Sequence, residues 1–170
     1  YLATIFDDSP AGAMAAVLAD PASRTAHVQA VVAVVTDGGF DGVDLDYEKF
    51  AFSDDRSTWA TTRPLWIAFL DELAVALDAI DAQLVVSVPP VYDDGQTDAS
   101  GYWVYDYASM GRIVDRIRVM AYDYSFTGSA PGPIAPIEWV RGLVDAITGL
   151  VPPEKIDLGI PTYGYDWVRS

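Results

Sequence analysis

The feature that most restricts the fold of this chain is a regular alternation of short strand-forming runs with longer stretches of helical periodicity. The short runs predict strands at residues 2–6, 40–47, 84–88, 117–122 and 156–161. The longer stretches predict helices at residues 22–36, 64–80, 106–113 and 136–150. Strands joined by helical crossovers predict an α/β fold with a parallel sheet, because parallel strands need long connections.

Two parallel architectures fit this alternation. One is a doubly wound open sheet of five strands, which suits a chain of 170 residues. The other is part of a (β/α)8 barrel, whose complete form typically needs about 250 residues. Periodicity does not distinguish them. In both architectures ligands bind at the carboxyl ends of the strands, so candidate functional residues are sought there.

Composition excludes several classes of function. The chain has no cysteine and one histidine, which excludes disulfide frameworks, cysteine nucleophiles and zinc sites built on cysteine or several histidines. Acidic residues outnumber basic ones by 25 to 10, a formal net charge of −15, so nucleic acid and anionic membrane surfaces would be repelled. The longest unbroken aliphatic run, residues 30–35, is too short for a membrane span.

A row of acidic residues marks the predicted strand at residues 40–47. The segment 41–48 reads DGVDLDYE. Because side chains alternate across a strand, Asp44, Asp46 and Glu48 share one face, and the apolar residues between them share the other. Carboxylates in a parallel sheet are costly, since such a sheet is buried on both faces. Stability alone would therefore not select this row.

Three interpretations of the row remain open: a solvated acidic edge, a divalent metal site and a general acid. Carboxylates bind Mg²⁺, but no glycine-rich phosphate-binding loop accompanies these ones. As a general acid, Glu48 would lie at the carboxyl end of the strand. The neighbouring Asp46 disfavours a second negative charge, which raises the pKa of one of the two groups. A protonated glutamic acid at that position suits proton donation to a glycosidic oxygen.

These residues resemble glycoside hydrolase family 18, the chitinases and related N-acetylglucosaminidases. Residues 41–48 are similar to the family signature DxxDxDxE, residues 120–123 (MAYD) to its MxYD strand end, and residues 158–164 (LGIPTYG) to its next strand. Residues 131–140 and 163–167 are similar to a bacterial branch that includes spore-cortex and cell-wall lytic members acting on peptidoglycan.

The resemblance implies a (β/α)8 TIM barrel in which the acidic strand is strand four. The chain would then form a single, partial catalytic domain over residues 1–170, from about strand 3 to strand 7. The family's strands one, two and eight, including the tryptophan that strand eight supplies to the sugar site, have no counterpart. The Ser-x-Gly-Gly of its strand three is replaced by residues 4–7 (TIFD).

The resemblance also implies a reaction: retaining, substrate-assisted hydrolysis of β-1,4-linked N-acetylglucosamine glycans, either chitin or peptidoglycan. Glu48 would protonate the leaving oxygen while the substrate's own acetamido oxygen attacks the anomeric carbon. Asp46 would orient the acetamido N–H and stabilise the oxazolinium ion, and Asp44 would share a hydrogen bond with Asp46. Tyr122 would hydrogen-bond the acetamido oxygen. No metal or cofactor is implied.

Four further residues are candidates for substrate binding: Met120, Asp123, Tyr163 and Trp167. Asp123 has the opposite parity to Tyr122, so it reaches the site only if the strand has ended there. Two other functions remain open, a non-catalytic carbohydrate-binding protein on the same scaffold and a metal-dependent, phosphatase-like α/β protein. The resemblance implies an extracellular, cell-wall or spore location, and the oligomeric state stays undetermined.

Overall fold

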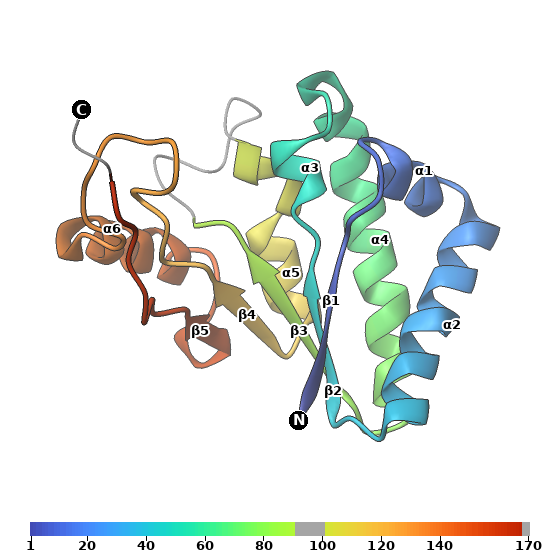
Figure 1. The fold of residues 1–170 in the computed structure, drawn as a ribbon. Helices are drawn as coiled ribbons and strands as arrows, with labels where there is room; N and C mark the ends of the chain where they lie inside the picture. Colours follow the sequence, from blue (N-terminus) through green and yellow to red (C-terminus); the bar gives the residue numbers. More distant parts are fainter. Residues whose placement is uncertain (91–100, 168–170) are drawn as a thin grey trace.

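In the computed structural model, five parallel strands form one sheet with helices packed on one face (Figure 1). The structure describes residues 1–90 and 101–167. The strands are β1 (Leu2–Phe6), β2 (Gly42–Asp46), β3 (Gln83–Val88), β4 (Arg116–Val119) and β5 (Ile156–Leu158). The α-helices are α1 (Ala13–Ala19), α2 (Pro21–Gly38), α3 (Lys49–Phe52), α4 (Trp59–Asp78), α5 (Tyr107–Ile113) and α6 (Ile137–Thr148). Short 3₁₀ turns cover Arg56–Thr58, Gly101–Tyr105 and Pro153–Lys155.

The strands follow one another across the sheet in the order β1-β2-β3-β4-β5, and every neighbouring pair is parallel. The register places Asp44 of β2 between Thr4 of β1 and Val85 of β3. A doubly wound sheet reverses its strand order at a switch point, and this sheet has no reversal. The doubly wound alternative is therefore wrong, and the sequential order is that of a (β/α)8 barrel.

The hydrophobic core lies between the sheet and helix α4. Phe69, Leu70, Leu73 and Leu77 share one buried face of this helix. They meet alternate strand residues such as Val43 and Val86. Burying one such large apolar side chain contributes roughly 1.5–3 kcal/mol. Helices α1, α2 and α5 pack around α4 in turn (Figure 1).

Several element bounds differ from those predicted. Helices α1 and α3 were not predicted, and α4 begins at Trp59 rather than at Pro64 because Trp59 and Thr62 are buried in the core. Strand β4 ends at Val119 instead of residue 122. The neighbouring β3 ends at Val88 and is followed by two prolines, which cannot extend the hydrogen-bond ladder. In the described part of the chain, no helix combines the length and apolarity that crossing a membrane requires.

Candidate active site

The acidic row of β2 faces away from the helices. Its apolar neighbours Val43 and Leu45 are fully buried on the helix side. Tyr47 is also buried there, and its hydroxyl lies 2.8 Å from Nε2 of His27 on α2. The Tyr105 hydroxyl donates a hydrogen bond of 2.7 Å to the carbonyl oxygen of Tyr47. Buried aromatic side chains on the helix side of the sheet thus fix the backbone that leads into Glu48.

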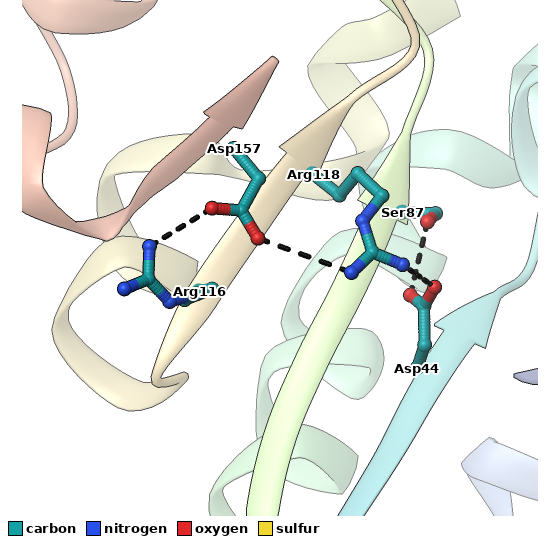
Figure 2. A network of polar contacts seen from close by, with 5 residues as sticks. All are labelled: Asp44, Ser87, Arg116, Arg118 and Asp157. Atoms are coloured by element: carbon teal, nitrogen blue, oxygen red, sulfur yellow. Dashed lines mark hydrogen bonds and ion pairs between the residues drawn. The ribbon is translucent and has the colours of Figure 1, made fainter. Parts of the chain in front are cut away.

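Asp44 is the most deeply buried member of the row, with 3% of its surface exposed. The Ser87 hydroxyl of β3 donates a hydrogen bond of 2.9 Å to its Oδ1, and Arg118 of β4 forms an ion pair with its Oδ2 (Figure 2). No hydrogen bond joins Asp44 to Asp46 among the described residues: Asp44 accepts from Ser87 and Arg118, and Oδ1 of Asp46 has no partner.

Arg118 belongs to a longer network on this face of the sheet. Its Nη2 lies 3.9 Å from Oδ2 of Asp157 on β5, and Arg116 donates a hydrogen bond of 2.8 Å to Oδ1 of the same carboxylate (Figure 2). Sequence reasoning missed this network. The available signal was a pair of arginines at alternate positions of β4, which places both charges on one face of the strand.

Asp46 and Glu48 are half-buried, and both have raised pKa values. Burial is the main cause of the raised pKa of Asp46, and the charge of Asp44 adds to it. Burial is also the main cause of the raised pKa of Glu48, and the charges of Asp46 and then Asp123 add to it. The sequence indicated the charge effect but not the larger effect of burial. A raised pKa favours a protonated Glu48, the form that a general acid requires.

The segment after β4 brings Met120, Tyr122 and Asp123 to the same place. Because β4 ends at Val119, Asp123 turns into the site, with a left-handed backbone φ of 57°. Burial, and then the charges of Asp46 and Glu48, raise the pKa of Tyr122, so its hydroxyl keeps its proton. Gly159 leaves room for the Tyr122 ring, since a Cβ at residue 159 would lie 2.8 Å from Cε1 of that ring.

Two cavities flank Glu48 at the carboxyl ends of the strands. The larger, about 650 Å³, is lined by the predicted residues Glu48, Met120, Tyr122 and Asp123. The rest of its wall is aromatic and proline-rich: Phe52, Pro89, Pro90, Tyr102, Tyr124, Phe126 and Trp139. The smaller, about 340 Å³, is lined by Phe6, Asp7, Asp8, Asp46, Glu48, Lys49, Phe52 and Ser53. Glu48 thus faces both cavities.

Two of the predicted binding residues lie beside the larger cavity rather than among its described lining residues. The hydroxyl of Tyr163 donates a hydrogen bond of 2.6 Å to Oδ1 of Asp123, and that of Tyr165 donates one of 3.0 Å to the same oxygen. Trp167 packs its ring against Tyr165 at a centroid distance of 6.0 Å. Contact of Tyr163 and Trp167 with a substrate therefore stays a prediction.

The metal interpretation of the acidic row finds no geometric support in residues 1–90 and 101–167. Nowhere in these ranges do three or more histidine or acidic side chains converge in an arrangement that could hold a metal ion. Asp44 is instead held by a hydroxyl and a guanidinium group. The three carboxyl groups therefore have separate surroundings and do not form one ligand set.

A comparison with protein families bears on the same residues. The model of glycosyl hydrolases family 18 matches residues 8–170. This chain belongs to glycosyl hydrolase family 18. The family indicated by the acidic row and by the two later segments is thereby confirmed.

Two bacterial proteins illustrate the position of the chain within family 18. YdhD of Bacillus subtilis (strain 168), a candidate sporulation-specific glycosylase, is 36% identical over 152 residues, covering 89% of this chain and 34% of YdhD. The cortical fragment-lytic enzyme of Bacillus anthracis is 38% identical over 63 residues, covering 37% of this chain and 15% of that enzyme.

Solved structures of family 18 relatives share the fold. The crystal structure of YdhD matches with a TM-score of 0.85 and 33% identity, covering 98% of this chain and 54% of the other. A chitinase from Chromobacterium violaceum ATCC 12472 matches with a TM-score of 0.80 and 28% identity, covering 96% of this chain and 49% of the other. The sheet is thus part of a TIM barrel, as predicted, and the chain spans about half the length of these structures.

Proposed function

We propose that this chain carries the catalytic acid of a retaining glycoside hydrolase that cleaves β-1,4-linked N-acetylglucosamine glycans. One observation carries the proposal. Glu48 is half-buried at the carboxyl end of β2, faces two cavities and has a raised pKa. A carboxyl group in that setting holds its proton to higher pH than an exposed one does and can release it to a substrate oxygen.

The proposed reaction proceeds in two steps. Glu48 donates its proton to the glycosidic oxygen as the bond to the anomeric carbon breaks, and the acetamido oxygen of the substrate forms a new bond to that carbon. Glu48, now a carboxylate, then takes a proton from the water that opens the oxazolinium ion. Two displacements at one carbon retain its configuration. Because the nucleophile comes from the substrate, no second carboxylate is needed; family 18 is a recognised exception to the two-carboxylate scheme.

The neighbours of Glu48 suit this reaction. Asp46 keeps a buried oxygen, Oδ1, that has no hydrogen-bond partner among the described residues, and the acetamido N–H would supply one. Tyr122 lines the same cavity as Glu48, and its hydroxyl would donate to the acetamido oxygen. The aromatic wall, including Phe52, Tyr124 and Trp139, offers apolar faces on which sugar rings stack. Met120 and Asp123 would complete the pocket.

The natural glycan is proposed to be peptidoglycan or chitin, since relatives of both kinds share the fold. The names of YdhD and of the cortical fragment-lytic enzyme favour cell-wall glycan and a spore or cell-wall location. The matched chitinase favours chitin. Digests of chito-oligosaccharides and of purified peptidoglycan glycan strands, compared at equal sugar concentration, separate the two substrates.

The test of the proposed function is the release of new reducing ends by the chain and by its Glu48→Gln variant. Glutamine keeps the shape of the side chain but has no proton to donate, so we expect the rate to fall by about 10²–10⁴-fold or more. Glu138→Gln is the matched control, because Glu138 is an exposed residue of α6 paired with Arg141. Near-normal hydrolysis by Glu48→Gln would contradict the assignment of the acid.

A non-catalytic carbohydrate-binding role is the second candidate, because the chain covers 54% of the YdhD structure and 49% of the chitinase. That role predicts glycan binding by calorimetry with no product from either the parent chain or Glu48→Gln. Product from the parent chain alone would exclude it.

A further inference from the structure

Asp44 and Asp46 differ in whether their carboxylate oxygens have hydrogen-bond donors. Asp44 accepts from the Ser87 hydroxyl at Oδ1 and from the Arg118 guanidinium at Oδ2. Asp46, two residues later on the same face, keeps a buried Oδ1 for which the described residues provide no donor. A buried acceptor without a donor is costly, so such a group points to a partner that arrives later.

The obvious internal donor for this oxygen would be a protonated Asp44. The Arg118 guanidinium can only donate, and it donates to Oδ2 of Asp44. The Ser87 hydroxyl donates to Oδ1, so Asp44 is the acceptor in both contacts. The side chain of Asp44 is 4% exposed, so without Arg118 its charge would be buried and unpaired. Arg118 therefore decides whether Asp44 can offer a proton to its neighbour.

We propose that Arg118 is a positioning residue that holds Asp44 as an acceptor and so reserves the open oxygen of Asp46 for the N–H of a substrate. This proposal deepens the proposed function and rests on it. Nη1 of Arg118 pairs with Asp44 directly, whereas its Nη2 lies 3.9 Å from Asp157 of β5, beyond hydrogen-bond distance (Figure 2). The contacts that hold Asp44 of β2 thus come from Ser87 of β3 and Arg118 of β4.

Other charged and titratable groups surround Asp46, so the effect of Arg118 on Asp46 has to be separated from theirs. Glu48 follows on the same face, and Asp7, Asp8 and Lys49 line the smaller cavity with it. Tyr105 and Tyr122 are also close enough to feel its charge. An experiment must therefore follow Asp46 itself and compare Arg118 with a cation that does not touch Asp44.

Arg116 provides that comparison. It lies two residues from Arg118 on the same face of β4, but its guanidinium pairs with Asp157 rather than with Asp44 in the described part of the chain. The variants are Arg118→Gln and Arg116→Gln, produced with carboxyl-carbon-13 aspartate. The Asp46 resonance is assigned by its absence from Asp46→Asn, and its titration is followed by NMR without substrate.

In Arg118→Gln we expect the buried Asp44 to take up a proton and donate a hydrogen bond to Asp46. A donated hydrogen bond favours the charged form, so the Asp46 resonance should titrate about one pH unit lower than in the parent chain. Arg116→Gln should leave it unmoved. If Arg118 acted only as a nearby positive charge, its loss would move the Asp46 titration to higher pH, and an upward shift or no shift overturns the proposal.

The same variants have a kinetic prediction. In Arg118→Gln, Asp44 occupies the acceptor meant for the acetamido N–H, so kcat/KM on a chito-oligosaccharide should fall about 10- to 100-fold, the effect of one hydrogen bond to a charged group. Arg116→Gln should stay close to the parent chain. If both variants lose activity equally, Arg118 has no special role.

A double variant keeps the test possible if the single variant fails to fold. If Arg118→Gln does not fold, Asp44→Asn combined with Arg118→Gln removes both charges and gives residue 44 an amide N–H in place of the proton. The downward shift of the Asp46 titration should persist in it, and its absence overturns the proposal. The titration needs no substrate. An active Glu48→Gln would contradict the proposed function whatever the titration shows, whereas an unmoved titration beside an inactive Glu48→Gln would contradict this inference alone.

Discussion

At the scale of single residues, the site is built by giving three neighbouring carboxyl groups different surroundings. Asp44 is buried and paired with Arg118, Asp46 is half-buried with one oxygen unpartnered, and Glu48 faces both cavities. Burial raises the pKa of the last two, and each also feels the charge of the residue two positions before it. The row therefore favours a proton at its outer end, where a glycosidic oxygen would lie.

The pH dependence of hydrolysis tests the link between Asp46 and Glu48. Asp46→Asn removes a negative charge that raises the pKa of Glu48. The pKa of Glu48 should fall, so the alkaline limb of the kcat/KM profile, where the acid loses its proton, should move to lower pH. The charge of Asp123 raises the pKa of Glu48 less than the charge of Asp46 does. Asp123→Asn should therefore move the alkaline limb in the same direction by a smaller amount. An unmoved limb in Asp46→Asn would mean that the two carboxyl groups are not coupled.

At the scale of elements, the strand and helix alternation and the acidic row were predictable, because they depend on local periodicity. The short helices α1 and α3 were not, since neither is long enough to show a period. Arg118 and Asp44, 74 residues apart, meet because of the register between β2, β3 and β4, which no local pattern contains. The early end of β4, which depends on prolines in a neighbouring strand's segment, escaped prediction for the same reason.

The packing of β5 against the segment after β4 gives a prediction for Gly159. A Cβ at this position would lie 2.8 Å from the Tyr122 ring and 3.0 Å from the carbonyl oxygen of Val119. Gly159→Ala should displace Tyr122 and lower kcat/KM by about tenfold or more, since even small misplacements in an active site are costly. Gly164→Ala, which meets nothing within 4 Å, is the control. Equal activity of the two variants would show that Tyr122 is not needed where it lies.

The central role of helix α4 in the core gives a prediction for stability. Leu70 is fully buried, so Leu70→Ala should lower the free energy of unfolding by about 2–5 kcal/mol. Val75, on the same helix, is 68% exposed, and Val75→Ala should change it by less than about 0.5 kcal/mol. Urea unfolding followed by circular dichroism measures both. Similar values would mean that α4 does not pack against the sheet as described.

At the scale of the whole molecule, function and stability oppose each other at Glu48. A carboxyl group whose pKa is raised by folding binds its proton more tightly in the folded state than in the unfolded state. Its contribution to stability is therefore lost as pH rises from the ordinary pKa of 4.5 through the raised value. The fold thus holds its proposed acid at the expense of stability near neutral pH.

The stability of Glu48→Gln follows from this linkage. Near pH 7 the variant should have a higher free energy of unfolding than the parent chain, and the difference should shrink at low pH, where Glu48 is protonated in both states. Glu72→Gln should show the opposite sign near pH 7, because hydrogen bonds from Thr25 and Arg24 lower the pKa of Glu72. A Glu48→Gln variant less stable than the parent chain near pH 7 would contradict a raised pKa.

The proton on Glu48 can be observed directly, since the chain has four glutamates, Glu48, Glu72, Glu138 and Glu154. Carboxyl-carbon-13 glutamate gives four titrating resonances, and Glu48→Gln identifies one of them by its loss. We predict that this resonance titrates above the ordinary value of 4.5 and that the Glu72 resonance titrates below it. A Glu48 resonance that titrates at or below 4.5 would contradict the general-acid assignment.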